Sequence, residues 1–125
     1  MATIHISIDE AIKASVFDVV SDVPADDIIA AMDRQYVAGI PRNALWDHAR
    51  ADFNRLETGD YRRIAMAAKE RAHYRVGGKT AFVTAGALEM FAVNLLEANL
   101  KVIDLPFDTR FFATREEAVA WLLEK

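Results

Sequence analysis

Residues 43–49 have the sequence Asn43-Ala44-Leu45-Trp46-Asp47-His48-Ala49, with two large apolar side chains next to each other at the middle. Successive side chains of a β-strand point to opposite faces of the sheet, so a strand here must bury Leu45 on one face and Trp46 on the other. Strands covered on both faces are typical of the interior of an α/β sheet. The segment therefore predicts an inner strand of such a sheet.

A hairpin and a helix are expected before this inner strand. Residues 4–8 alternate isoleucine with polar side chains, which is the pattern of a strand with one buried face. Residues 12–20 are rich in β-branched and aromatic side chains, and they predict a second strand that pairs antiparallel with the first through a turn at Asp9-Glu10. Residues 24–36 then place apolar side chains at helical spacing after a proline, and the sequence Gly-Ile-Pro at 39–41 ends this helix.

Helices and strands also alternate after the inner strand. Residues 61–72 carry an alanine-rich apolar stripe that ends before Gly77-Gly78, and residues 88–100 are apolar around most of a helical circumference. Residues 80–85 and 109–113 predict strands, and Thr114 with Glu117 forms a capping-box pattern that starts a last helix. The resulting order, ββαβαβαβα, predicts an α/β fold in one domain over residues 1–125. We expect a mostly parallel five-stranded sheet with an N-terminal antiparallel hairpin, right-handed crossovers and packed helices.

Composition excludes several classes of function. The chain has 125 residues, of which 53% are hydrophobic and 27% charged, as in a globular protein with a proper core. It has no cysteine, which removes disulfides, thiolate metal sites and cysteine nucleophiles. The net charge of −4 has the wrong sign for a general nucleic-acid binder, although residues 42–79 hold nine basic and five acidic side chains. No run approaches the roughly 18 apolar residues of a membrane span, so we expect no transmembrane segment and a cytoplasmic protein.

Three segments resemble the SpoIIAA-like proteins. They are Leu45-Trp46-Asp47 at the end of the inner strand, the basic helix leading into Gly-Gly-Lys-Thr-Ala-Phe-Val at 77–83, and Phe-Phe-Ala-Thr-Arg-Glu-Glu-Ala-Val-Ala-Trp-Leu at 111–122. The resemblance covers nearly the whole chain. It implies the fold of STAS domains, with a topology likened to CRAL-TRIO lipid-transfer modules, and a non-enzymatic regulatory or ligand-binding domain.

The resemblance also draws attention to Thr58 and Gly59. In the phosphoregulated STAS proteins a phosphorylatable serine stands in an Asp-Ser-Ser-Gly motif at the start of a helix. This chain has Leu56-Glu57-Thr58-Gly59-Asp60 there, so only the Thr-Gly pair matches and both serines are missing. We expect Thr58 to be the N-cap of the helix, with its phosphorylation as the alternative.

The basic helix allows two interpretations. Arg62, Arg63 and Arg75, with Lys69 and Arg71 between them, can form a solvated face that is partly neutralised by nearby carboxylates, which is the favoured interpretation. Alternatively, they bind the phosphate of an anionic lipid or of a nucleotide, or they bind an acidic partner protein. The sequence Gly-Gly-Lys-Thr at 77–80 does not indicate a nucleotide-binding P-loop, because it runs from a helix into a strand and lacks the first glycine of the motif.

The sequence names no catalytic constellation. Asp47 and His48 are the most suggestive pair, but neighbours on a strand point to opposite faces and cannot easily form a hydrogen-bonded dyad. We expect Asp47 to accept from backbone amides. The three histidines lack metal-ligand spacing, and each is expected at the surface or a strand end. We therefore predict a protein that is not an enzyme and has no cofactor and no metal.

The candidate site lies at the carboxyl ends of the parallel strands, where open α/β sheets bind ligands and partners. This places Asp47, His48, the loop 52–60, residues 84–86 and the start of the second helix together. An apolar patch is expected at Met90, Phe91, Leu95, Phe107 and Phe111, as a homodimer interface or as the wall of a ligand pocket. Otherwise these side chains are internal.

The leading hypothesis is a regulatory or protein-interaction domain. We expect it to form a homodimer and to act by binding a regulatory protein partner. The alternative is a carrier of a lipid or another small molecule, with an apolar pocket and the basic helix at the headgroup.

Overall fold

The computed structural model describes residues 3–35, 41–52, 56–84, 94, 96–101 and 103–124. Residues 96–101 are helical and lie between β4 and β5, so the predicted order ββαβαβαβα is confirmed. The elements are β1 Thr3–Asp9, β2 Ala14–Asp22, α1 Ala25–Gln35, β3 Asn43–Asp52, α2 Thr58–Glu70, the 3₁₀ turn η1 Ala72–Arg75, β4 Lys79–Val83, β5 Asp108–Phe112 and α4 Arg115–Leu123.

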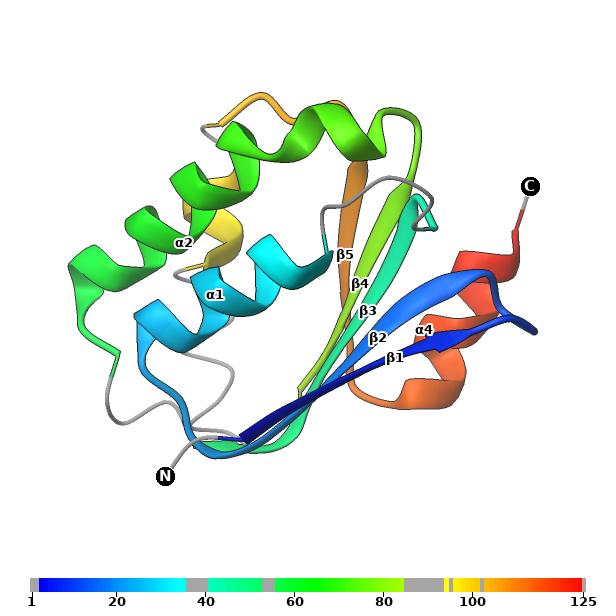
Figure 1. Ribbon diagram of the computed structural model, residues 1–125, viewed down its shortest axis with the longest axis horizontal. Coiled ribbons are helices and arrows are strands. Elements are labelled where there is room, and N and C mark those ends of the chain that lie inside the picture. Colours follow the sequence, from blue (N-terminus) through cyan, green and yellow to red (C-terminus); the bar gives the residue numbers. More distant parts are fainter. Residues whose placement is uncertain are drawn as a thin grey trace.

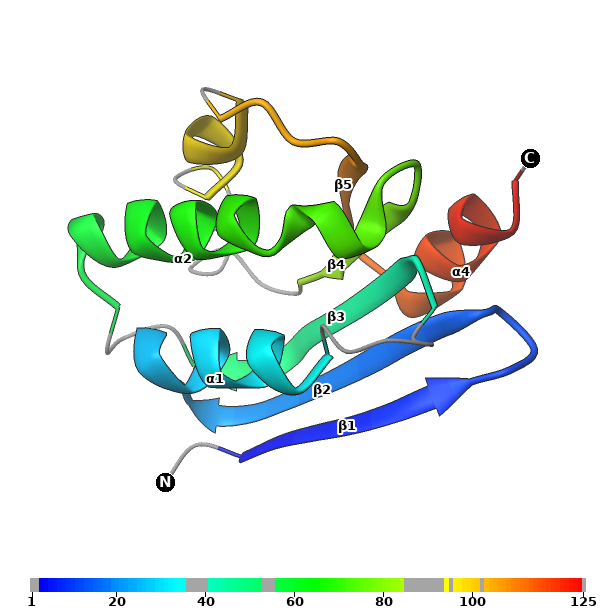
Figure 2. The same ribbon diagram turned by 45° about the horizontal axis from the view of Figure 1, so that its top comes forward.

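The five strands form one mixed sheet in the order β1-β2-β3-β4-β5. β1 and β2 pair antiparallel, and every later pair is parallel, as the sequence predicts. α1, α2 and the helical residues 96–101 lie on one face, and α4 lies on the other (Figures 1 and 2). Two parallel strands that are neighbours in a sheet must be joined by a crossover connection, and helices form these connections here.

β3 separates two hydrophobic cores. Trp46 packs in the larger core under α1 and α2, whereas Leu45 packs in the smaller core against α4. Both side chains are almost fully buried, at 4% and 0% exposure. The prediction of a strand covered on both faces is therefore confirmed.

Several boundaries differ from the predicted ones. β2 begins at Ala14 rather than residue 12, because residues 10–13 form the turn and Lys13 has a positive φ of 52°. β3 extends to Asp52 rather than 49, since it continues to pair with β2 after β4 has ended. α1 begins at Ala25, and Pro24 precedes it with its carbonyl accepting from two amides of the first turn. α2 ends at Glu70, well before the glycines, because the chain tightens into η1.

Gly78 holds the connection from η1 to β4 against the start of β3. A Cβ at this position would lie 2.2 Å from the carbonyl oxygen of Arg42, which is backbone and cannot easily give way. We expect Gly78→Ala to lower the free energy of unfolding by about 2 kcal/mol, as overpacking does. Gly59→Ala is the matched control, because nothing lies within 4 Å of its added Cβ and alanine favours a helix. Urea denaturation of both variants tests this, and an equal stability for the two would contradict it.

No helix in the described ranges has the length and apolar character needed to cross a membrane.

Candidate functional site

A row of aromatic side chains crosses the face of the sheet that α1 and α2 cover. The register places Phe17, Trp46, Phe82 and Phe111 opposite one another on β2, β3, β4 and β5. The rings of Phe17 and Trp46 stack with centroids 3.9 Å apart, and those of Phe82 and Phe111 stack at 4.7 Å. Stacked pairs of this kind stabilise a sheet beyond the area that they bury. The row forms a flat apolar floor beneath the helices.

His48 lies beside this floor, two residues after Trp46 on the same face of β3. It is 5% exposed, and its ring lies 6.0 Å from that of Trp46 and 6.3 Å from that of Phe82. Burial lowers its pKa from 6.5 to about 4, because the charged imidazolium would lose its hydration, and the nearby Asp47 carboxylate offsets only part of this. The imidazole is therefore neutral at pH 7. The prediction that each histidine lies at the surface or a strand end is wrong for His48.

A small cavity of about 50 Å³ lies between the aromatic floor and the helices. Most of its wall is apolar, and the lining residues with polar groups are His48, Tyr61, Arg75 and three threonines. This volume is well below that of a dry cavity that binds benzene, which is about 150 Å³. It corresponds to the space of a few water molecules. Its lining residues are Ile28, Met32, Trp46, His48, Leu56, Tyr61, Ile64, Ala68, Arg75, Thr80, Phe82, Thr84, Leu96, Leu100, Phe107, Thr109 and Phe111.

Arg75 is buried at the wall of this cavity, with 1% exposure. Its guanidinium donates to the carbonyl oxygens of Arg42 and Lys79, both at 2.9 Å, and to the hydroxyl of Thr80 at 2.6 Å. It also lies 4.4 Å from the ring centroid of Phe107. The expectation that Arg75 belongs to a solvated basic helix is wrong, because the helix ends at Glu70 and η1 turns the side chain inward.

Asp47 lies on the opposite face of β3 from His48. Its carboxylate accepts from the amide of Ala49 at 3.0 Å, as the sequence predicts, and from Arg115 Nη1 at 3.1 Å. The same nitrogen donates to Asp18 at 2.9 Å, so one guanidinium at the start of α4 links two strands. Asp47 and His48 are therefore separated by the sheet and form no dyad.

The start of α2 presents Thr58 and Gly59 to solvent. The predicted N-cap at Thr58 is wrong by one residue: Glu57 is the N-cap, and Thr58 is the first helical residue. The carboxylate of Asp60 accepts from the amide of Glu57 at 2.9 Å, which is half of a capping box and fixes this end of the helix. The hydroxyl of Thr58 is thus not needed as the cap.

An open groove of about 370 Å³ runs between α1 and α2. Arg63 pairs across it with Asp26 at 2.6 Å, and Arg71 pairs across it with Asp33. These ion pairs agree with the favoured interpretation of a solvated, partly neutralised face. The groove is lined by Ile29, Gly59, Arg62, Arg63, Met66, Ala67, Glu70 and Arg71.

The predicted apolar patch is only partly described. Met90, Phe91 and Leu95 lie outside the described residues. Phe107 is buried and Phe111 is half-buried, and both line the cavity; Phe111 also borders a hollow at the surface beside Lys101 and Arg110. Residues 85 and 86 of the expected site also lie outside the described part, whereas Thr84 is buried in the cavity wall.

Lys79 has a structural role that the sequence did not indicate. Its ammonium group donates to the carbonyl oxygens of Trp121 and Glu124, at 2.8 and 2.7 Å. A cation at this position satisfies the last carbonyls of α4 and interacts favourably with the helix dipole.

The sequence named His48 and Arg75 as candidate residues, and it also contained signals for their burial. His48 follows Trp46 by two positions, which puts both on one face of a strand. Arg75 follows Ala68 and Ala72 at seven and three positions, which continues the apolar stripe of the helix.

Comparison with solved structures shows a SpoIIAA-like fold. One similar structure is an uncharacterised protein of the DUF3478 family with a SpoIIAA-like fold from Shewanella loihica PV-4. It has 20% sequence identity and a TM-score of 0.57 over 97% of this chain and 93% of that chain. Another is an anti-sigma factor antagonist from Mycobacterium paratuberculosis, with 12% identity and a TM-score of 0.66 over 99% of this chain and 96% of that chain.

No model of a known protein family matches the chain, and no curated protein matches it either. The resemblance to SpoIIAA-like and STAS proteins is thus confirmed for the fold. The likeness to CRAL-TRIO modules stays a prediction.

Proposed function

We propose that residues 1–125 form one non-catalytic regulatory domain that acts in the cytoplasm by binding another protein. The observation that carries this proposal is the likeness of fold, over nearly the whole chain, to a protein described as an anti-sigma factor antagonist. Such a protein acts through contacts with other proteins, and the argument from it is one of fold analogy. The separation of Asp47 from His48 by the sheet supports a role without acid-base chemistry.

The groove between α1 and α2 is the surface proposed for the partner. Its lining includes the exposed Gly59, which follows the exposed Thr58 in the chain, and it offers the guanidinium of Arg62 beside the side chain of Met66, which is 38% exposed. Arginine and methionine are enriched at protein interfaces, where a charged group and an adaptable apolar one serve together. The ion pairs from Arg63 and Arg71 to α1 keep the two walls of the groove in place.

Gly59 allows a direct test of this surface. We expect Gly59→Trp to lower the affinity for the partner at least about tenfold, because a large ring would fill the end of the groove. Nothing lies within 4 Å of a Cβ at this position, so a side chain can leave the backbone here without a clash at its first atom. The measurement is quantitative affinity capture from a lysate of the source organism, followed by binding of the purified partner.

Gly59→Ala is the matched control, since it alters the same position without filling the groove. The proposal expects one protein retained by the wild type and by Gly59→Ala and lost with Gly59→Trp. Equal retention by the two variants would exclude the groove as the binding surface.

The internal cavity supports a second candidate, a small-molecule carrier. Its wall includes Phe107 and Phe111 together with the helical residues Leu96 and Leu100. A volume of about 50 Å³ is too small for an acyl chain, so a carrier would have to move the segment 96–101 away from the sheet. The proposed headgroup residues do not gather at the cavity, because Arg75 lines it whereas Arg62 and Arg63 lie in the outer groove.

A further inference from the structure

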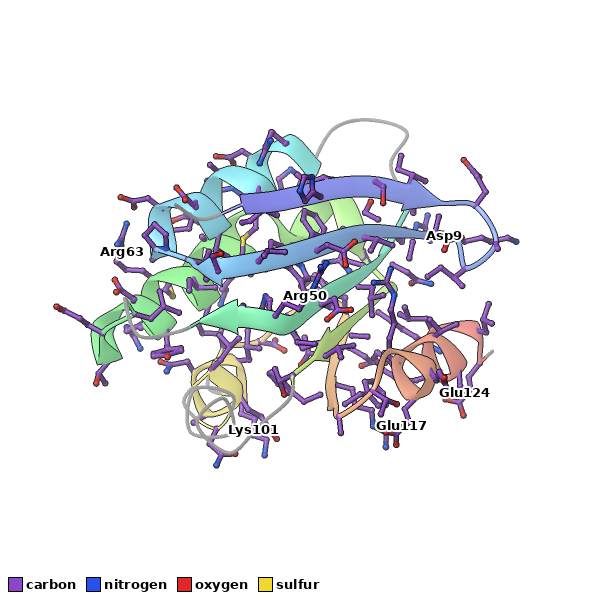
Figure 3. All side chains as sticks on the ribbon, turned by 90° about the horizontal axis from the view of Figure 1, so that it is seen from below. Asp9, Arg50, Arg63, Lys101, Glu117 and Glu124 are labelled. Carbon is purple, nitrogen blue, oxygen red and sulfur yellow. The ribbon has the colours of Figure 1, made fainter. Side chains whose placement is uncertain are left out.

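β1 forms one edge of the sheet. It pairs with β2 along its whole length, Thr3 to Asp9, and no strand in the described ranges pairs with its other side. Seen from below, β1 lies at the border of the sheet, and α4 covers other strands (Figure 3). The outer backbone amides and carbonyls of an edge strand can form hydrogen bonds with a further strand.

This edge lacks the features by which proteins usually block such pairing. β1 has the sequence Thr-Ile-His-Ile-Ser-Ile-Asp, with no proline and no lysine, and its register with β2 is regular from end to end. Its one carboxylate, Asp9, is at the last position and accepts from the amide of Ala11 in the turn. Natural edge strands normally carry lysine, proline or a bulge to prevent association.

β1 is also complementary to itself. A two-fold axis through Ile6 is the arrangement that pairs all seven residues of β1 with those of a second, antiparallel copy. On the face that α1 and α2 cover, it places Ile4 opposite Ile8 of the other copy and Ile6 opposite Ile6. On the other face it places His5 opposite Ser7, so no two like charges meet there.

Ile8 is the residue of β1 whose exposed apolar side chain would be covered most by this pairing. Its side chain is 53% exposed, although Ile4 and Ile6 pack against the larger core. Pairing with a second copy would extend that apolar row across the two-fold axis and cover Ile8.

We propose that the protein forms a homodimer in which the β1 strands of two copies pair antiparallel about Ile6 and join the two sheets. The chemistry of recognition is main-chain hydrogen bonding together with a continuous isoleucine row, and a symmetric interface of this kind is closed. The interface is separate from the α1–α2 groove, so each copy keeps that surface free for a different protein.

Ile8→Lys tests the interface. Sedimentation of the wild type over a range of concentrations is expected to give a mass of about twice the 14.0 kDa of one chain. In the dimer each lysine would lie opposite Ile4, so the dissociation constant is expected to rise at least about tenfold. Leu123→Lys is the matched control, because Leu123 is 55% exposed on α4, a helix that packs against β3, β4 and β5. A monomeric wild type, or a dimer that Ile8→Lys leaves unchanged, would overturn the proposal.

Cysteine cross-linking gives a second measurement that does not depend on Ile8. The chain has no cysteine of its own, so the double variant His5→Cys, Ser7→Cys carries the only thiols. In the proposed register the residue at position 5 of each copy lies directly opposite position 7 of the other, with Cβ atoms about 4.5–5.5 Å apart, which is close to the spacing of a disulfide. Mild oxidation is expected to yield a covalent dimer, whereas Glu116→Cys, exposed at the start of α4, is not. Equal yields for the two would contradict the register.

Discussion

Arg75→Met is expected to lower the free energy of unfolding by about 3 kcal/mol or more. The guanidinium is buried and donates to two carbonyl oxygens, of Arg42 and Lys79, and to the Thr80 hydroxyl. Methionine fills much of the same volume but donates nothing, and each buried acceptor that loses its donor costs about 1–3 kcal/mol. Denaturation in guanidinium chloride measures the change.

Arg62→Met is the control for this prediction. Arg62 is exposed on α2, where a substitution changes stability by about 0.5 kcal/mol or less. If the two variants were equally stable, the hydrogen bonds of Arg75 would not hold β3, η1 and β4 together. If Arg75 instead bound an anionic headgroup, its loss would release a bound molecule without this loss of stability.

The second large effect is a loss of stability between pH 6.5 and pH 4. The pKa of His48 falls to about 4 in the folded protein from an ordinary value of 6.5, because burial disfavours the imidazolium. The unfolded chain therefore takes up a proton first as the pH falls. The contribution of neutral His48 is fully present above pH 6.5 and is lost toward pH 4, by about 3 kcal/mol in total.

His48→Gln separates this effect from the titration of other groups. Urea denaturation at a series of pH values is expected to give a shallower decline in the variant than in the wild type, since glutamine does not titrate. His73→Gln is the control, because His73 is exposed in η1 and lies outside the proposed β1 interface. The assignment to His48 fails if the wild type and His48→Gln decline in parallel.

Local sequence patterns were enough to predict the sheet and the order of its elements. The adjacent Leu45 and Trp46 identified β3 as a strand covered on both faces, and this holds because side chains alternate strictly along a strand. The capping pattern of Thr114 and Glu117 also identified the start of α4, where the Thr114 hydroxyl accepts from the amide of Glu117 at 3.2 Å.

The candidate site was harder to predict, because it depends on where helices end and what packs over them. The end of α2 at Glu70, five residues before Arg75, changes that arginine from a surface cation into a buried donor. The pairing of Arg63 with Asp26 and of Arg71 with Asp33 joins segments 37 and 38 residues apart, and no local pattern indicates such contacts. Likewise, the cavity arises because α1, α2 and the helical residues 96–101 meet over one aromatic floor.

Native mass spectrometry of protein purified without detergent, followed by denaturing organic extraction of the same sample, tests the central claim most directly. A domain that acts through protein contacts is expected to give a whole multiple of the 14.0 kDa chain with no small molecule bound, and two copies if β1 pairs as proposed. A recurring adduct that is released on denaturation, such as an acidic lipid or a nucleotide, would contradict this account and identify the protein as a carrier.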